Sequence, residues 1–299
     1  MTAALQIAVV LIFAPLLLGV INRTKAIFAG RRGQPLLQAY YDIAKLLRKG
    51  TVLGETTTWV FLLGPAVAVA VPLVASLFLP LASSTAPLSF RGDLILFVYL
   101  FALSRFLTTS SALDTGSAFE GMGAAREVTF AVLAEPAIFF GLIALARISG
   151  SLSLASVLSV DGNGWRRATA ALVLIIAAWF VVVLAENSRV PFDDPNTHLE
   201  LTMIHEVMVL DHSGPAFGLI LYGAAMKLFI YSALVAALVV PRTHVPITDA
   251  AILTVAVLVI GVVIGVVESS MARLQLVRVP QLLITASLAA GFAVVLVLR

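Results

Sequence analysis

Ionisable side chains are concentrated between Ala185 and Gly214, a stretch that separates two long apolar segments. It contains six of the 16 Asp and Glu residues and three of the four His residues of the chain. The carboxylates are Glu186, Asp193, Asp194, Glu200, Glu206 and Asp211, and Arg189 is the one cation among them. Because neighbouring carboxylates repel one another, some of them bind protons near neutral pH and can pass them on. The stretch therefore predicts a row of acids that lines a cavity and handles protons.

A solvated acidic loop is the simpler interpretation of this stretch. It is disfavoured because apolar residues such as Phe192 and Met203 lie between the acids, which indicates packing against a partner. Asp194 and Pro195 form a good cap and first turn, so we expect a new helix that runs to about Leu210. On such a helix Glu200 and Glu206 would project to different sides, as acids along a cavity wall do.

The three histidines of the stretch, His198, His205 and His212, recur every seven residues. Two helical turns separate neighbours by about 10.5 Å, which is too far for shared ligation of one zinc ion. An H-E-x-x-H motif is also absent from the chain. The histidines therefore predict no metal site.

Two more ionisable residues, Glu135 and Lys227, interrupt apolar segments that are long enough to cross a membrane. A charge at that depth costs about 2.5 to 3.5 kcal/mol on insertion scales and normally faces a partner or a water-filled cavity. Lys227 is the obvious candidate to offset the charge of Glu135. The pair could be a buried ion pair that only fixes packing, or it could be part of a proton relay.

The composition indicates that membrane-spanning helices carry these residues. Of the chain, 61% is hydrophobic and only 12% is charged, and the mean hydropathy is +1.06. We expect a single all-α domain over residues 1–299, a polytopic integral membrane protein with about eight transmembrane helices. The expected spans are residues 3–21, 59–81, 94–113, 128–146, 168–185, 215–240, 250–267 and 279–298. The span at 94–113 is the weakest, because Arg105 interrupts it.

The basic residues predict the orientation of these spans. Residues 22–58 alone hold seven of the 19 Lys and Arg residues, so this loop is expected on the cytoplasmic side. Eight spans then place both termini in the periplasm, in a bacterial or archaeal cytoplasmic membrane. The first apolar segment has no basic residue before it and no cleavage pattern after it, so it is expected to be retained.

An amphipathic cytoplasmic helix is expected between Arg31 and Gly50. Leu36, Tyr40, Ile43 and Leu47 form one apolar stripe at helical spacing, and Pro35 suits the first turn. The helix could lie on lipid headgroups or could dock a soluble partner, and both can hold together.

The chain has no cysteine, which excludes disulfides, thiolate nucleophiles and the cysteine ligation of iron–sulfur clusters. Any electron carrier that serves this protein must belong to another subunit. The small net charge of +3 gives no reason to expect a nucleic-acid partner.

Three motifs resemble one protein family. "AENSRVPFDDPNTHLELTMIHEVMVLDHSG" resembles the loop after the fifth span of the complex I subunit 1 family, and more closely its formate hydrogenlyase and hydrogenase-4 branch. The basic "GRRGQPLLQAYYDIAKLLRKG" after the first span and "GAAREVTFAVLAEP" entering the fourth extend the resemblance over nearly the whole chain.

The resemblance implies a membrane anchor without a redox centre of its own, whose place in an oxidoreductase complex is non-catalytic. Expected partners are hydrogenase-like large and small subunits with a nickel–iron centre, an iron–sulfur subunit, antiporter-like membrane subunits and membrane lipid. The loop from Glu186 to Asp211 would line a cavity below the last cluster. Glu135 and Arg126 match a Glu and an Arg of the family around the fourth span, and Asp42 and Lys45 match an Asp and a Lys after the first. With Arg31 and Arg32, the latter two are expected to dock the partner arm.

The sequence departs from the quinone-reducing members of the family at Asn196 and His198, where those proteins carry further glutamates. This difference favours a complex that evolves or oxidises hydrogen and couples its chemistry to proton or ion movement. The alternatives are the quinone-site subunit of a proton-pumping NADH:quinone oxidoreductase and, from another class, a membrane prenyltransferase that uses Asp193 and Asp194 with magnesium. A prenyltransferase usually needs a second Asp-rich cluster, and a secondary transporter would need inverted repeats, which we do not find.

Overall fold

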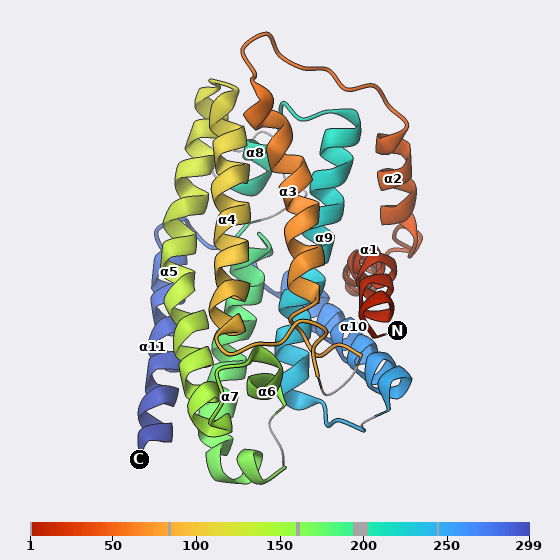
Figure 1. Cartoon of the computed structure of the whole chain (residues 1–299). Helices are drawn as coiled ribbons and strands as arrows, with labels where there is room; N and C mark the ends of the chain where they lie inside the picture. Colours follow the sequence, from red (N-terminus) through yellow and green to blue (C-terminus); the bar gives the residue numbers. More distant parts are fainter. Residues whose placement is uncertain (1, 83–84, 160–161, 194–202, 244) are drawn as a thin grey trace.

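The computed structural model describes residues 2–82, 85–159, 162–193, 203–243 and 245–299. These residues form helices and no strand, which confirms the expected all-α class. Eight helices are long and apolar enough to cross a membrane (Figure 1). They are α1 (Thr2–Phe28), α3 (Trp59–Ser76), α4 (Asp93–Asp114), α5 (Ala118–Ser149), α7 (Gly162–Glu186), α9 (Gly214–Val239), α10 (Pro246–Ser270) and α11 (Val279–Leu298). Three short helices join them: α2 (Gln38–Leu47), α6 (Leu154–Leu158) and α8 (His205–Met208).

Each expected span coincides with one of the eight long helices, including the weak one, where α4 continues through Arg105. The main differences are at the ends. Helix α5 begins at Ala118 rather than at residue 128, and α1 continues to Phe28. Polar residues there did not end the helices, because several of them find partners in the fold: Lys25 pairs with Glu268, and the buried Glu120 accepts the Asp211 N–H.

Helix α9 is the centre of the bundle. In an 18-residue stretch of α9, 72% is buried, against 22% in a stretch of the same length in α11. Helix α9 contacts α1, α2, α3, α7 and α10. Glycines allow the close approach: a Cβ at Gly223 would lie 3.1 Å from the Ala68 Cβ of α3. Close backbone contact through small residues is the usual way in which membrane helices pack, because lipid gives them no hydrophobic driving force.

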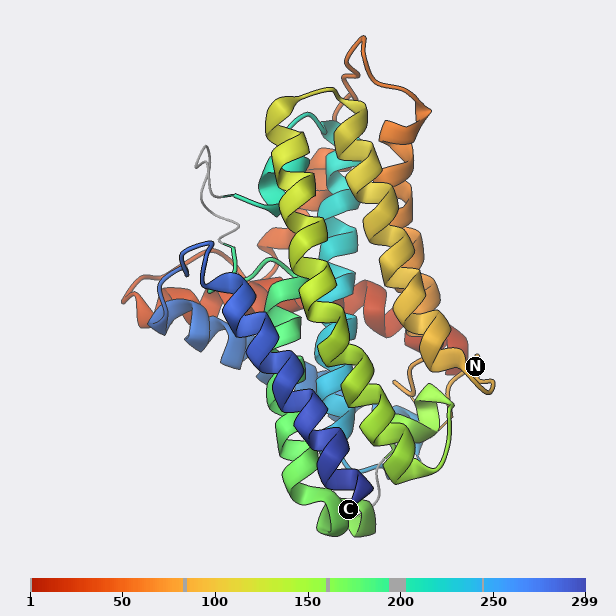
Figure 2. The same cartoon turned by 90° about the vertical axis from the view of Figure 1, so that its left-hand side faces the viewer.

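Helix α1 crosses α3, α4, α5 and α9 at a steep angle (Figures 1 and 2). Pro15 lies inside α1 and has no N–H, so the carbonyl of Leu11 lacks its intrahelical donor. The Tyr222 hydroxyl of α9 donates to that carbonyl at 2.9 Å. The Tyr40 hydroxyl of α2 donates to the next carbonyl, that of Ile12. The crossing is therefore fixed by side chains from two neighbouring helices.

Two expectations for the short helices need correction. Helix α2 begins at Gln38 rather than near Pro35, and Leu36 and Leu47 are exposed while Ile43 is partly covered. The helix expected from Asp194 to Leu210 begins in residues outside those described, and its described part is helical only over α8. Proline spacing predicted where the helix could begin, whereas contacts with other helices decide which residues stay helical.

The chain begins and ends on the same side of the bundle, as eight spans require. Helix α1 begins beside the α3–α4 link, where the Gln6 side-chain amide donates to the Leu79 carbonyl at 2.7 Å. Helix α11 ends near the link between α5 and α7 (Figures 1 and 2). The segments that carry most of the candidate site residues all lie on the opposite side.

Candidate functional site

A cavity of about 380 Å³ opens on the side of the bundle opposite the termini. Its walls come from α1 to α5, from the end of α7, from α9 and from the described residues between α7 and α9. Its ionisable lining residues are Asp42, Arg105, Glu127, Glu186, Arg189, Asp193, His205, Glu206, His212 and Lys227. The stretch that drew attention in the sequence therefore does line a cavity.

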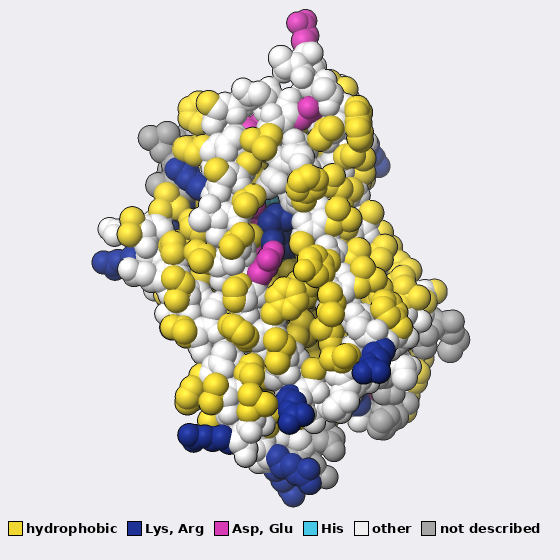
Figure 3. Space-filling model, turned by 60° about the vertical axis from the view of Figure 1, so that its left-hand side comes forward, with side chains coloured by type: hydrophobic (Ala, Val, Ile, Leu, Met, Phe, Trp, Pro, Cys, Tyr) yellow, Lys and Arg dark blue, Asp and Glu magenta, His cyan; other side chains and the backbone are white. Residues whose placement is uncertain are grey.

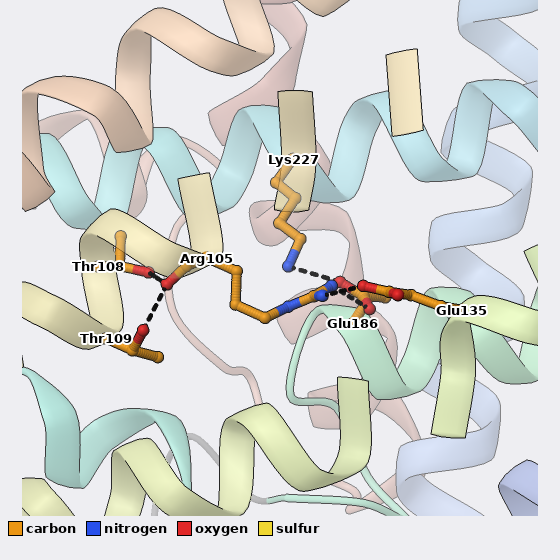
Figure 4. A network of polar contacts seen from close by, with 6 residues as sticks. All are labelled: Arg105, Thr108, Thr109, Glu135, Glu186 and Lys227. Atoms are coloured by element: carbon orange, nitrogen blue, oxygen red, sulfur yellow. Dashed lines mark hydrogen bonds and ion pairs between the residues drawn. The ribbon is translucent and has the colours of Figure 1, made fainter. Parts of the chain in front are cut away.

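At the inner end of the cavity, the lining residues Arg105, Glu186 and Lys227 form a network with Glu135, which is not a lining residue (Figure 4). The network has two cations and two carboxylates from four helices. The guanidinium of Arg105 in α4 donates to Glu135 of α5 at 2.7 Å and to Glu186 of α7 at 2.6 Å. The ammonium of Lys227 in α9 lies 2.9 Å from the other oxygen of Glu186. The four formal charges sum to zero, so the helices bury them together at a lower cost than separately.

Burial differs sharply between the two carboxylates of this network. The Glu186 side chain is 2% exposed, whereas that of Glu135 is 33% exposed. Halfway along a mostly hydrophobic face, side chains coloured as cationic and as acidic are visible together (Figure 3). Glu186 is thus the buried carboxylate at the centre of the network, and Glu135 is the partly exposed carboxylate at its edge.

The sequence led us to expect Lys227 as the partner of Glu135, and the structure corrects this. Lys227 pairs with Glu186, and Arg105 occupies the position between the two carboxylates. The reason is the position at which α7 ends, because its last residue lies beside the middle of α9. Helix periodicity gives no information about which helices are neighbours.

A second set of ion pairs holds the segment that follows Glu186. Asp193 accepts backbone N–H bonds from Ile204 and His205 at 3.1 Å each, and its other oxygen lies 2.9 Å from Arg273. Arg189 lies 3.5 Å from Glu268, a carboxylate at the end of α10. These contacts fix the cavity wall between α7 and α8.

His212 is a buried cavity histidine whose ring stacks on Phe61 with centroids 3.9 Å apart. Its Nε2 lies 3.4 Å from the Ser111 hydroxyl. Burial lowers the pKa of His212 to about 4, so the ring is neutral at physiological pH. Among the described residues, no group of three or more His, Asp and Glu side chains could hold a metal ion.

The remaining predicted residues fall in several places. Asp194, Glu200 and His198 lie outside the described residues. Glu206 lines the cavity, while Asp211 is exposed and its N–H donates to the buried Glu120 at 3.2 Å. Arg126 donates to the Met203 carbonyl at 2.9 Å, which ties α5 to the residue two positions before α8.

The residues expected to dock a partner divide between the cavity and the surface. Asp42 lines the cavity and accepts from the Gln38 amide at 2.8 Å. Arg31, Arg32 and Lys45 are exposed.

The ionisable residues of this region that were missed in the sequence include Arg105, Glu127, Glu268 and Arg273. Arg105 was noticed only as an interruption of a weak span, although the rule that led to Glu135 and Lys227 applies equally to it. Glu127 lines the cavity one position after Arg126. Glu268 directly follows the expected end of the seventh span, so no signal separated it from an ordinary helix end.

Comparisons with known proteins agree with the resemblance seen in the sequence. Residues 1–299 match the family described as NADH dehydrogenase. Formate hydrogenlyase subunit 4 of Escherichia coli (strain K12) is 34% identical over 237 residues, which cover 79% of this chain and 76% of that protein. Hydrogenase-4 component C of the same organism is 33% identical over 239 residues, covering 80% and 75%.

More distant relatives include NADH-quinone oxidoreductase subunit 8 of Rhodothermus marinus, which is 22% identical over 68% of this chain and 60% of its own length. One chain in the structure of the membrane-bound sulfane sulfur reductase, an archaeal respiratory membrane complex, shares the fold. Its TM-score is 0.84 at 19% identity, over 99% of this chain and all of that one. The sequence, the eight-span fold and these matches agree, and the chain belongs to the NADH dehydrogenase family, the family of complex I subunit 1.

Proposed function

We propose that this chain is the membrane-anchor subunit of a complex-I-related nickel–iron hydrogenase of the formate hydrogenlyase type. It docks the cytoplasmic electron-transfer arm and links the redox chemistry of that arm to proton or ion movement. The observation that carries the proposal is the network of Arg105, Glu135, Glu186 and Lys227 at the inner end of an open, acid-lined cavity.

The residues of this chain indicate which part of the work falls to it and which to its partner subunits. Without cysteine, the chain offers no thiolate to iron–sulfur clusters, so the clusters and the nickel–iron centre belong to partner subunits. What the chain offers is a hollow with carboxylates that connects one end of the bundle to the level of Lys227. A redox centre docked over the opening can change the electrostatic potential in the hollow and so the proton affinity of its acids.

The proposed arrangement puts the cavity side in the cytoplasm and both termini in the periplasm. The exposed Arg31, Arg32 and Lys45 lie on the cavity side and supply positive charge for docking an arm subunit or for anionic lipid headgroups. The partially exposed Glu135 would face an antiporter-like membrane subunit, because a carboxylate in contact with lipid is costly.

The alternatives are not favoured. The quinone-oxidoreductase relative named above is less similar than the two hydrogenase subunits and covers less of the chain. A magnesium-dependent prenyltransferase would need Asp193 free for the metal, whereas Asp193 is held by Arg273 and two backbone N–H groups.

Purification from native membranes tests the partners. We expect a tagged chain to retain iron–sulfur and hydrogenase-like subunits, and a chain that is stable and active without them would overturn the proposal.

Glu135→Gln in the intact complex tests the site. Gln still accepts a hydrogen bond from Arg105 but cannot take up a proton, so ion translocation should fall while assembly is retained. Glu55→Gln, at an exposed carboxylate outside the cavity, is the control. Wild-type coupling in Glu135→Gln would exclude Glu135 from the path.

A further inference from the structure

Helices α1 and α10 meet along a stripe of small residues that ends in a buried charge. Gly261 and Gly265 are spaced as G-x-x-x-G and press against Leu17, Ile21 and Thr24 of α1. A Cβ at Gly265 would lie only 2.7 Å from the Thr24 Cβ and 3.0 Å from the Ile21 carbonyl oxygen. The two glycines therefore allow the backbones of α1 and α10 to approach closely.

Glu268 lies on the same stripe, three residues after Gly265, and its side chain is fully buried. One carboxylate oxygen lies 2.8 Å from the Lys25 ammonium in the last turn of α1. The other lies 3.5 Å from the Arg189 guanidinium, three residues after Glu186. A single carboxylate thus holds two chain segments that are far apart in the sequence.

These two segments form different walls of the cavity. Beyond Lys25 the chain turns into α2, whose Gln38, Ala39 and Asp42 line the cavity. Before Arg189 it carries Glu186 and Ser188, which line the cavity from another element. The α10–α11 link adds two contacts to the second wall: Arg273 with Asp193, and the Leu274 N–H with the Pro191 carbonyl at 2.9 Å.

We propose that Glu268 is a positioning residue that couples the two walls of the cavity, holding α2 through Lys25 and the segment after Glu186 through Arg189. The two walls share one anchor, because the loss of Glu268 leaves both cations without their acid. Helix α10 lines no part of the cavity, yet it sets the distance between residues that do. The importance of this coupling for ion movement rests on the proposed function, whereas the coupling itself can be measured in the chain directly.

Because this chain has no cysteine of its own, label found on its gel band reports only the introduced cysteine. Single cysteines at Ser188 and at Ala39 report on the two walls through their rates of maleimide labelling in the intact membrane complex. Glu268→Gln should raise both rates by about tenfold, since removing one partner of a buried ion pair shifts a local opening equilibrium by at least that factor. Lys25→Gln should raise the rate at Ala39→Cys alone, and Arg189→Gln the rate at Ser188→Cys alone.

Asp249→Asn is the matched control, because Asp249 is also a buried carboxylate of α10 but lies in its first turn, away from the cavity. It should change neither rate. Unchanged labelling in Glu268→Gln overturns the proposal, and so does an equal rise in Asp249→Asn, which would show general loosening.

A charge exchange keeps the proposal testable if Glu268→Gln does not assemble. Lys25→Glu combined with Glu268→Lys restores the contact between α1 and α10 but puts a lysine beside Arg189. Labelling at Ala39→Cys should then return to the parent rate while labelling at Ser188→Cys stays about tenfold faster. Parent rates at both positions would show that Arg189 is not held by Glu268. All of these outcomes are read from labelling rates and not from hydrogenase activity or from the identity of the partner subunits, so the proposed function can fail while this proposal stands.

Discussion

Replacement of Arg105 by Met removes the group that joins the two carboxylates of the cavity network. Arg105 donates to Glu135 at 2.7 Å and to Glu186 at 2.6 Å, and hydrogen bonds to charged groups contribute about 1.5 to 3 kcal/mol each. The Glu135 contact weighs less, because that side chain is 33% exposed. Glu186 keeps Lys227 as a partner. Together these effects predict a loss of about 3 to 4 kcal/mol in the free energy of unfolding, near the lower part of the range for broken buried ion pairs.

The assay is equilibrium unfolding of the purified chain in detergent micelles, followed by helical circular dichroism. Arg147→Met is the control, since Arg147 is exposed in the last turn of α5 and should cost no more than about 0.5 kcal/mol. Arg105→Lys should lie between the two, because one ammonium cannot reproduce a guanidinium that donates to two carboxylates.

A double-mutant cycle with Glu135→Gln separates the two contacts of Arg105. If Arg105 and Glu135 interact, their effects should differ from additivity by at least about 0.5 kcal/mol. A cost for Arg105→Met below about 1 kcal/mol, or strict additivity with Glu135→Gln, would refute the idea that Arg105 holds the network together.

Two further predictions concern His212 and the packing of α10. Because burial lowers the folded-state pKa of His212 to about 4, the unfolded chain takes up a proton first as the pH falls, and stability should drop between about pH 6.5 and pH 4 by up to about 3 kcal/mol. His212→Phe should remove this part of the pH dependence, and an unchanged unfolding profile would contradict it. Gly265→Ala should cost about 1 to 3 kcal/mol, because its Cβ would lie 2.7 Å from the Thr24 Cβ, whereas Gly291→Ala meets only Phe140 at 3.6 Å and should be nearly neutral. Equal unfolding free energies for the two variants would argue against close contact of α1 and α10.

The positions of the spans could be predicted from the sequence because each depends on its own residues. Length and hydropathy are local quantities, and even the span interrupted by Arg105 forms a continuous helix. The ends were less predictable, as the early start of α5 at Ala118 shows. A helix end depends on whether the next residues find contacts, and those contacts come from other parts of the chain.

The candidate site was predictable in its residue types but not in its pairing. Glu135 and Lys227 were identified because ionisable groups inside a membrane span are costly, and Glu186 was identified as one of the acids clustered after the fifth span. The ion-pair partners of these residues depend on which helices are neighbours and on how far along each helix they meet. The periodicity of a single helix contains neither kind of information. The same rule could have identified Arg105, but its position between Glu135 of α5 and Glu186 of α7 cannot be read from the sequence of α4.

The position of the cavity follows from the length of α7. Its last residue, Glu186, pairs with Lys227, which is 13 residues from the start of α9 and therefore about 20 Å along that helix. Helix α7 thus ends far below the level at which α9 begins, and the described residues between the two helices, α8 among them, leave a gap that is part of the cavity. The cavity reaches the charged network through this gap, although α4, α5 and α9 all continue past it as unbroken helices. The cavity therefore reaches Glu186 between these helices, and Arg105 joins that carboxylate to Glu135.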